Sequence, residues 1–112
     1  MSRRLDAALY YARKKRRNRI AGSPANVEAP VITGIPSPGE VLTCSTGDWS
    51  NEPDSFKYEW RRDNEIIPFA THSTYELGVS EENMMINCTV RAGNEKGSTG
   101  ITSESVGPVA DI

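Results

Sequence analysis

The chain has little of the features on which disulfide-rich proteins, metal centres and membrane proteins depend. It contains only two cysteines and one histidine in 112 residues. Two cysteines exclude a disulfide-dense scaffold, and the 44 positions that separate Cys44 from Cys88 fit no common zinc pattern. The longest apolar stretch near the start, residues 7–12, is far too short to cross a bilayer. We therefore expect no metal site and no membrane span.

The start of the chain also lacks the pattern of an export signal. Arg3 and Arg4 resemble the opening of a twin-arginine signal, but Asp6 and the basic cluster at residues 13–17 interrupt any hydrophobic region that would follow. We expect no signal peptide and synthesis in a cytoplasm, where thiols stay reduced.

Groups that could perform catalysis are scarce as well. His72 has no cysteine, histidine or carboxylate cluster at ligand spacing. Glu81, Glu82, Asp63 and Glu65 are expected to be solvated loop charges, and no acidic cluster matches a calcium loop. No nucleophile–base pair or phosphate loop can be assembled from the sequence. We expect no catalytic residue, no cofactor and no enzymatic activity.

What the chain does have is a sharp division of charge. Residues 1–20 hold eight basic residues and one acid, which give +7, and the other 92 residues hold five basic and 14 acidic residues, which give −9. The chain is therefore a basic arm attached to an acidic body.

The basic arm is predicted to be a helix over residues 2–20. Leu5, Ala8, Leu9 and Ala12 recur at helical spacing and form a narrow apolar stripe, and Ser2 is a suitable N-cap. Beyond Ala12 charge surrounds the helix, so it gains little by packing on its own domain. An isolated helix of this length is only marginally stable in water, so we expect it to need a partner.

Three roles compete for this arm. The first is docking on an acidic protein surface, the second is salt-dependent binding to the phosphate backbone of nucleic acid, and the third is a solvated tail. Docking is preferred because the arm combines an apolar stripe with aromatic residues, while the charge of the body would repel nucleic acid. Membrane-surface binding is weaker still because the apolar face is so narrow. The expected docking residues are Leu5, Leu9, Tyr10, Tyr11, Arg13, Lys14, Lys15, Arg16, Arg17 and Arg19.

The rest of the chain has the pattern of an all-β protein. Phe56, Tyr58 and Trp60 alternate with charged residues, and residues 86–92 alternate between apolar and polar in the same way. Glycine and proline separate the short runs. About seven strands are predicted, at residues 30–33, 41–46, 56–62, 65–68, 74–77, 84–93 and 98–106, with a hairpin turn at 94–97.

The core of this β-structure is expected around two cysteines and a tryptophan. Cys44, Trp60 and Cys88 fit a two-sheet sandwich with one cysteine on each sheet and the indole beside them. The cysteines are either a disulfide between the sheets or two buried thiols in contact, and the sequence leaves both open. Trp60 and Tyr75 are expected in the core, and Trp49 is expected to be partly exposed.

Several short motifs appear in order between residues 30 and 108, about 70% of the chain. They are Gly34, Pro38-Gly39 and Leu42, then Gly47-Asp48-Trp49, then Tyr58 to Asp63, then Ala70-Thr71 with Ser73 to Leu77, and then Cys88 to Asn94 with Gly97. This run resembles the immunoglobulin-like (Ig-like) domains of bacterial surface proteins and of structural proteins of tailed bacteriophages. Two departures are Asn64 in place of a turn glycine and Ile86 in place of a tyrosine-corner tyrosine.

The resemblance implies an Ig-like β-sandwich that acts as a non-catalytic module on a surface, with weak adhesion to host-surface carbohydrate as a further role. We expect a basic anchoring helix at 1–20, a linker at 21–29 and the Ig-like domain at 30–112. The expected function is a virion structural protein, made in the host cytoplasm, that decorates a capsid and contacts other virion proteins through its helix. Attachment to the neck or tail, and nucleic-acid binding by the arm, are the alternatives.

Overall fold

The computed structural model describes residues 20–111, and within them the chain is all-β, with a single turn of 3-10 helix. The helix expected over residues 2–20 lies outside the described residues, apart from Ile20. The strands are β1 (Ala25–Glu28), β2 (Ile32–Thr33), β3 (Val41–Cys44), β4 (Asp48–Ser50), β5 (Ser55–Arg62), β6 (Glu65–Ile66), β7 (Thr74–Glu76), β8 (Ile86–Asn94) and β9 (Gly97–Thr102), and the 3-10 turn η1 is Val79–Glu81.

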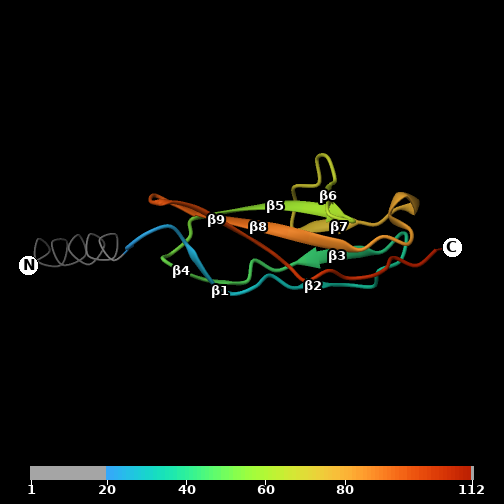
Figure 1. Ribbon diagram of the computed structural model, residues 1–112, viewed down its shortest axis with the longest axis horizontal. Helices are drawn as coiled ribbons and strands as arrows, with labels where there is room; N and C mark the ends of the chain where they lie inside the picture. The colour runs from blue at the N-terminus through green and yellow to red at the C-terminus, as the bar shows by residue number, and fades with distance from the viewer. Residues whose placement is uncertain (1–19, 112) are drawn as a thin grey trace, which may run out of the picture.

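The strands form three antiparallel sheets, an arrangement consistent with a β-sandwich (Figure 1). One sheet has four strands in the order β6-β5-β8-β9, the second has three in the order β2-β3-β7, and β1 pairs with β4 in the third. All pairings between these strands are antiparallel. The expected all-β architecture is therefore confirmed.

The two long strands β5 and β8 form the centre of the larger sheet. Eight consecutive residue pairs join them, from Ser55 opposite Gly93 to Arg62 opposite Ile86. Their alternating sequences explain the pairing, because an apolar face and a polar face on each strand line up in the same register. Trp60 thus lies directly opposite Cys88 on the inner face.

The β5–β6 hairpin depends on two residues in the left-handed region. Asp63 and Asn64 have φ of 46° and 67° and connect Arg62 directly to its partner Glu65. Positive φ at both central residues is what a two-residue type I′ hairpin requires, and aspartate and asparagine tolerate it better than other side-chain-bearing residues. Asn64 therefore occupies a turn position where glycine is more common.

The core forms between the four-stranded and three-stranded sheets. Leu42 and Cys44 from β3 are buried together with Trp60, Cys88 and Val90 from β5 and β8. The buried members of this cluster are Ile32, Leu42, Cys44, Trp60, Ile67, Leu77, Ile86, Cys88, Val90 and Val109. Packing of inner faces from two sheets is the main source of stability in such an architecture.

Several boundaries differ from those expected from the sequence, and β4 is not among the expected strands. Two differences lie at the ends of the described body. Residues 25–28, expected to belong to a linker, form β1 and pair with β4. The expected strand at 98–106 is shorter at its end, because β9 stops at Thr102 and Val106 makes only an isolated bridge to Ile86. The paired β-structure therefore starts five residues before the domain boundary drawn at residue 30.

One asparagine side chain fastens the beginning of the body to two other segments. The Asn94 Nδ2 group donates hydrogen bonds to the carbonyl oxygens of Gly22, at 3.0 Å, and Asn51, at 2.7 Å. Asn51 in turn donates from Nδ2 to the Ser23 carbonyl at 2.9 Å. We call Gly22, Ser23, Asn51 and Asn94 the entry joint. The chain enters here, beside the β8–β9 turn, and its last described residues lie at the other end of the body (Figure 1).

Candidate functional site

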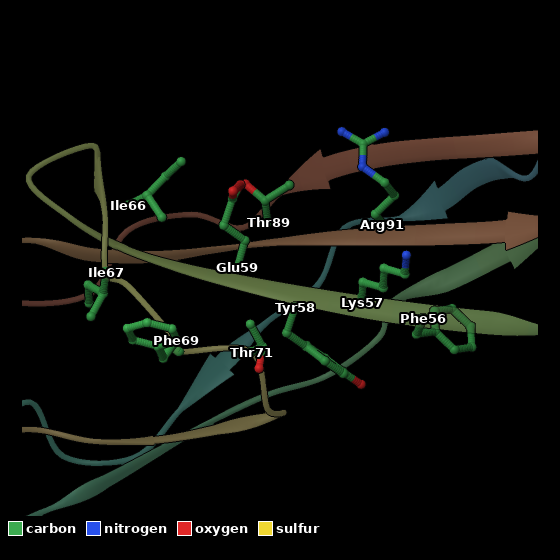
Figure 2. Close-up of a pocket in the computed structure, with 11 residues that line it drawn as sticks. Phe56, Lys57, Tyr58, Glu59, Ile66, Ile67, Phe69, Thr71, Thr89 and Arg91 are labelled. Atoms are coloured by element: carbon green, nitrogen blue, oxygen red, sulfur yellow. The ribbon is translucent and has the colours of Figure 1, made fainter.

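A groove of about 390 Å³ runs along β5 (Figure 2). Strand β5 and the segment that follows β6 form most of its walls, and β8 contributes two side chains. The lining residues are Phe56, Lys57, Tyr58, Glu59, Ile66, Ile67, Phe69, Ala70, Thr71, Thr89 and Arg91. This groove is the candidate site on the described body.

The groove exists because β6 is much shorter than β5. Its two residues pair only with Arg61 and Arg62 at the end of β5. At Trp60 the following segment still supplies partners: the Trp60 N–H donates to the Ala70 carbonyl at 3.4 Å, and the Trp60 carbonyl accepts from the Ile67 N–H at 2.9 Å. Beyond that point, from Ser55 to Glu59, no described strand pairs with β5 on this side.

Alternation along β5 places two sets of backbone groups at this open edge. In an antiparallel strand the N–H and C=O of one residue point to the same side, and successive residues point to opposite sides. Because the Trp60 groups point to the β6 side, those of Tyr58 and Phe56 point there too. No hydrogen bond within residues 20–111 uses the backbone groups of Tyr58 or Phe56 on that side.

Exposed apolar side chains lie along the groove. The Phe69 side chain is 95% exposed and that of Ile66 is 57% exposed. Phe69 also has a φ of 64°, and this left-handed backbone conformation is energetically unfavourable for a bulky residue. Phe56, at the other end of β5, is also exposed. A surface aromatic held in a strained conformation is a common feature of contact sites.

Two cations lie beside each other on the outer face of the groove. Lys57 and Arg91 occupy directly opposite positions on β5 and β8, and their side chains rise to the same side in Figure 2, while Tyr58 points to the opposite side. Neither cation has an ion pair with any described residue. The nearby Glu59 carboxylate is already engaged, because its Oε2 accepts from Arg61 Nη2 at 2.8 Å. The groove therefore presents local positive charge on a body that is acidic as a whole.

A buried ion pair lies between the start of the β5–β6 hairpin and η1. The Glu81 side chain is only 2% exposed, and its Oε2 accepts a hydrogen bond from Arg62 Nη1 at 2.7 Å. Its Oε1 accepts from the Gly78 N–H at 2.8 Å. Burial, followed by the charge of Glu81 and a hydrogen bond with it, raises the pKa of Tyr75, and Arg62 opposes that rise. The expectation that Glu81 is a solvated loop charge is therefore wrong.

The residues expected to mark the core come together. Cys44 and Cys88 are buried free thiols on the two facing sheets. The hydrogen bond with Cys44, with burial second, raises the pKa of the Cys88 thiol. Trp60 is fully buried, its ring stacks on Tyr75 at a centroid distance of 5.9 Å, and its Nε1 donates to the His72 carbonyl at 2.7 Å.

Trp49 is partly exposed and the turn residues Asp63 and Glu65 are exposed, as the sequence predicted. Trp49 is half-buried against the core, and its Nε1 donates to the Thr46 carbonyl at 2.7 Å. Asp63 and Glu65 are exposed at the β5–β6 hairpin, where Asp63 Oδ1 accepts from the Met85 N–H at 2.9 Å. These residues serve the local structure.

The ten expected docking residues between Leu5 and Arg19 lie outside the described residues. Sequence reasoning missed the groove, although the charges of Lys57 and Arg91 on alternating strands placed both on an outer face. Nothing in the sequence around Phe69 signals its exposure, because that depends on where the segment after β6 leaves the sheet.

Within residues 20–111, no three histidine, cysteine or acidic side chains gather where they could hold a metal ion. No helix in the same part of the chain is long and apolar enough to span a membrane. Comparisons with protein-family models, with curated proteins and with solved structures found no match to this chain.

Proposed function

We propose that the chain is a non-enzymatic structural protein of a virus particle, with an Ig-like sandwich carried on a basic anchoring arm. In this proposal residues 1–20 dock on another virion protein, and the sandwich projects as a capsid decoration module of the kind found in tailed bacteriophages. The chain would be made in the host cytoplasm and released with the particle.

The observation that carries this proposal is the contrast between the two parts of the chain and the place where they join. A segment of +7 meets a body of −9, and the entry joint fastens that segment at one end of the body. An anchor attached at one end leaves the sides and the far end of the body free. This geometry suits a module that is attached through its arm and whose body projects away from the attachment point.

The order of the strands supports the Ig-like part of the proposal. Cys44 on β3, Trp60 on β5 and Cys88 on β8 lie in one buried cluster between two antiparallel sheets, which supports an Ig-like arrangement. The central pairing of β5 with β8, the inner position of Trp60 and its contact with Tyr75 also suit that family. The missing tyrosine corner at Ile86 places it apart from antibody-type domains.

The direct test is to look for the chain on purified particles. Quantitative mass spectrometry of gradient-purified particles should find the full-length chain in a fixed ratio to the major capsid protein, and immunogold labelling should locate it on the capsid. Labelling at the neck or tail would favour that alternative site. Absence of the chain from purified particles would contradict a virion role altogether.

Full-length variants then separate protein docking by the arm from nucleic-acid binding, and a solvated tail would tolerate both sets of substitutions. Replacing Leu5 and Leu9 by serine should abolish attachment to particles if the apolar stripe docks on protein, whereas a nucleic-acid arm would lose function mainly when the cations at residues 13–19 become glutamine. Fluorescence anisotropy with mixed-sequence DNA over a salt series measures the second activity, whose affinity should fall steeply with salt. The matched control replaces Lys96, an exposed cation of the body outside the groove, by serine.

A further inference from the structure

We propose that the open edge of β5 accepts an extended peptide segment of a partner protein, added as an antiparallel strand, with an acidic residue placed opposite Lys57, on the face that Arg91 shares. This inference concerns the body alone and is independent of residues 1–19 and of the proposed virion role.

The backbone supplies the first part of the recognition. Phe56 and Tyr58 present their N–H and C=O groups to the open edge, and no described residue bonds them on that side. These groups continue the line along which Trp60 bonds Ile67 and Ala70. An added strand would therefore continue the hydrogen-bond ladder along β5 beyond the point where β6 ends. This mode of peptide binding is called strand addition.

The side chains supply the second part. A residue directly opposite Lys57 in an added strand shares its face. Arg91 lies one strand further away, on β8, and adds positive charge to the same face. Both cations lack an ion pair among the described residues, so an acidic side chain is favoured there. Residues opposite Phe56 and Tyr58 point to the other face, toward the groove wall that includes Thr71. The favoured sequence is thus apolar, acidic, apolar.

A second copy of the same chain fits the edge poorly. Two antiparallel β5 edges that pair Phe56 with Tyr58 place Lys57 directly opposite Lys57, and like charges in that position are destabilising. The register that places Tyr58 opposite Tyr58 avoids this, but it sets Phe56 opposite Trp60, whose backbone groups are already bonded. The edge therefore selects a different, acidic segment.

The probe is an acetylated and amidated heptapeptide that alternates valine and glutamate, with a valine–lysine peptide as its matched control. Both are titrated into the full-length, ¹⁵N-labelled protein while amide hydrogen exchange is followed residue by residue. In the free protein the amides of Lys57 and Glu59, which face β8, should exchange slowly, and those of Phe56 and Tyr58 rapidly. The glutamate peptide should slow exchange at Phe56 and Tyr58. This local readout separates edge binding from attraction of the peptide to the basic arm.

Two variants test the two parts of the recognition. Phe56→Pro removes one edge donor and leaves the β8 side of the ladder intact, and it should weaken peptide binding at least about tenfold. Lys57→Glu combined with Arg91→Glu leaves the backbone unchanged and should reverse the preference toward the lysine peptide. The second variant keeps the test valid if the first one fails to fold.

Three results would overturn the proposal. One is rapid exchange at Phe56 and Tyr58 that no concentration of the glutamate peptide slows. Another is equal protection by both peptides in the native protein and in the charge-reversed variant. The third is slow exchange at these two amides in the peptide-free protein that disappears on dilution, which would identify a second copy as the occupant.

Discussion

The buried ion pair between Arg62 and Glu81 leads to a quantitative prediction about stability. Glu81 is 2% exposed, whereas the Arg62 side chain is 32% exposed. Removal of Arg62 leaves a carboxylate in the protein interior that accepts from the Gly78 N–H but has lost its charged partner. An uncompensated buried charge is strongly destabilising, because the folded state has lost the hydration that the unfolded state keeps.

The size of the effect follows from the geometry. Breaking a fully buried pair costs about 3–5 kcal/mol, and the partial exposure of Arg62 lets water replace some of the lost contact. We therefore expect Arg62→Met to lower the free energy of unfolding by about 3 kcal/mol and Glu81→Gln to lower it by about 1–2 kcal/mol. The double variant should lose less than the sum, which gives a coupling of about 2 kcal/mol.

The assay is a double-mutant cycle by urea unfolding, followed by tryptophan fluorescence and circular dichroism. A matched control is available on the same strand. Arg61 and Glu59 also form a pair at 2.8 Å, but their side chains are 31% and 39% exposed. Exposed pairs contribute little, so the cycle of Arg61→Met and Glu59→Gln should give a coupling below about 0.5 kcal/mol. Equal couplings in the two cycles would show that burial of Glu81 does not govern its energetics.

Further predictions concern the thiols, a tyrosine and two glycines. A thiol reagent should find no reactive cysteine in the folded, reduced protein and two after denaturation, because Cys44 and Cys88 are both buried. The hydrogen bond between them lowers the pKa of Cys44 and raises that of Cys88, but neither thiol is accessible to the reagent. The pKa of Tyr75 is raised in the fold, so the protonated hydroxyl stabilises the folded state. This contribution should be complete below the unfolded pKa of about 10 and should be lost as pH rises through the folded pKa. In unfolding curves measured between about pH 9 and 11, Tyr75→Phe should therefore lose less stability with rising pH than the native protein. Gly47→Ala should lower the melting temperature far more than Gly39→Ala. Both glycines have positive φ, but a Cβ at Gly47 would clash with the backbone oxygen of Glu28, whereas Gly39 faces open space.

Sequence patterns predicted the parts of the fold that depend on local alternation. The apolar and polar residues of β5 and β8 alternate over most of their length, so both strands and their inner faces could be identified in advance. Asn64 and the turn at residues 95–96 also carried a local signal, since turn residues have restricted conformations. The buried Cys44–Trp60–Cys88 arrangement followed from these strands.

The sequence could not predict features that depend on contacts between distant segments. Strand β1 has one half-buried and three exposed side chains, and only its pairing with β4 defines it as a strand. Glu81 is buried because Arg62, 19 residues away, reaches it. The groove depends on the point where β6 stops, and no residue of β5 signals that its partner strand will be short.

The entry joint has a mechanical consequence. Any pull on the residues before Gly22 reaches Asn94 and Asn51 through side-chain hydrogen bonds before it reaches β1. Asn94 ends β8, the longest strand, which is paired along both of its sides. The force therefore acts along β8, where many hydrogen bonds must break at the same time. The short β1–β4 ladder, whose hydrogen bonds could break one after another, does not carry this force first. Asn94→Ala removes three hydrogen bonds, so it should lower the free energy of unfolding by about 1–3 kcal/mol and should also lower the force at which the domain opens in a single-molecule stretching experiment.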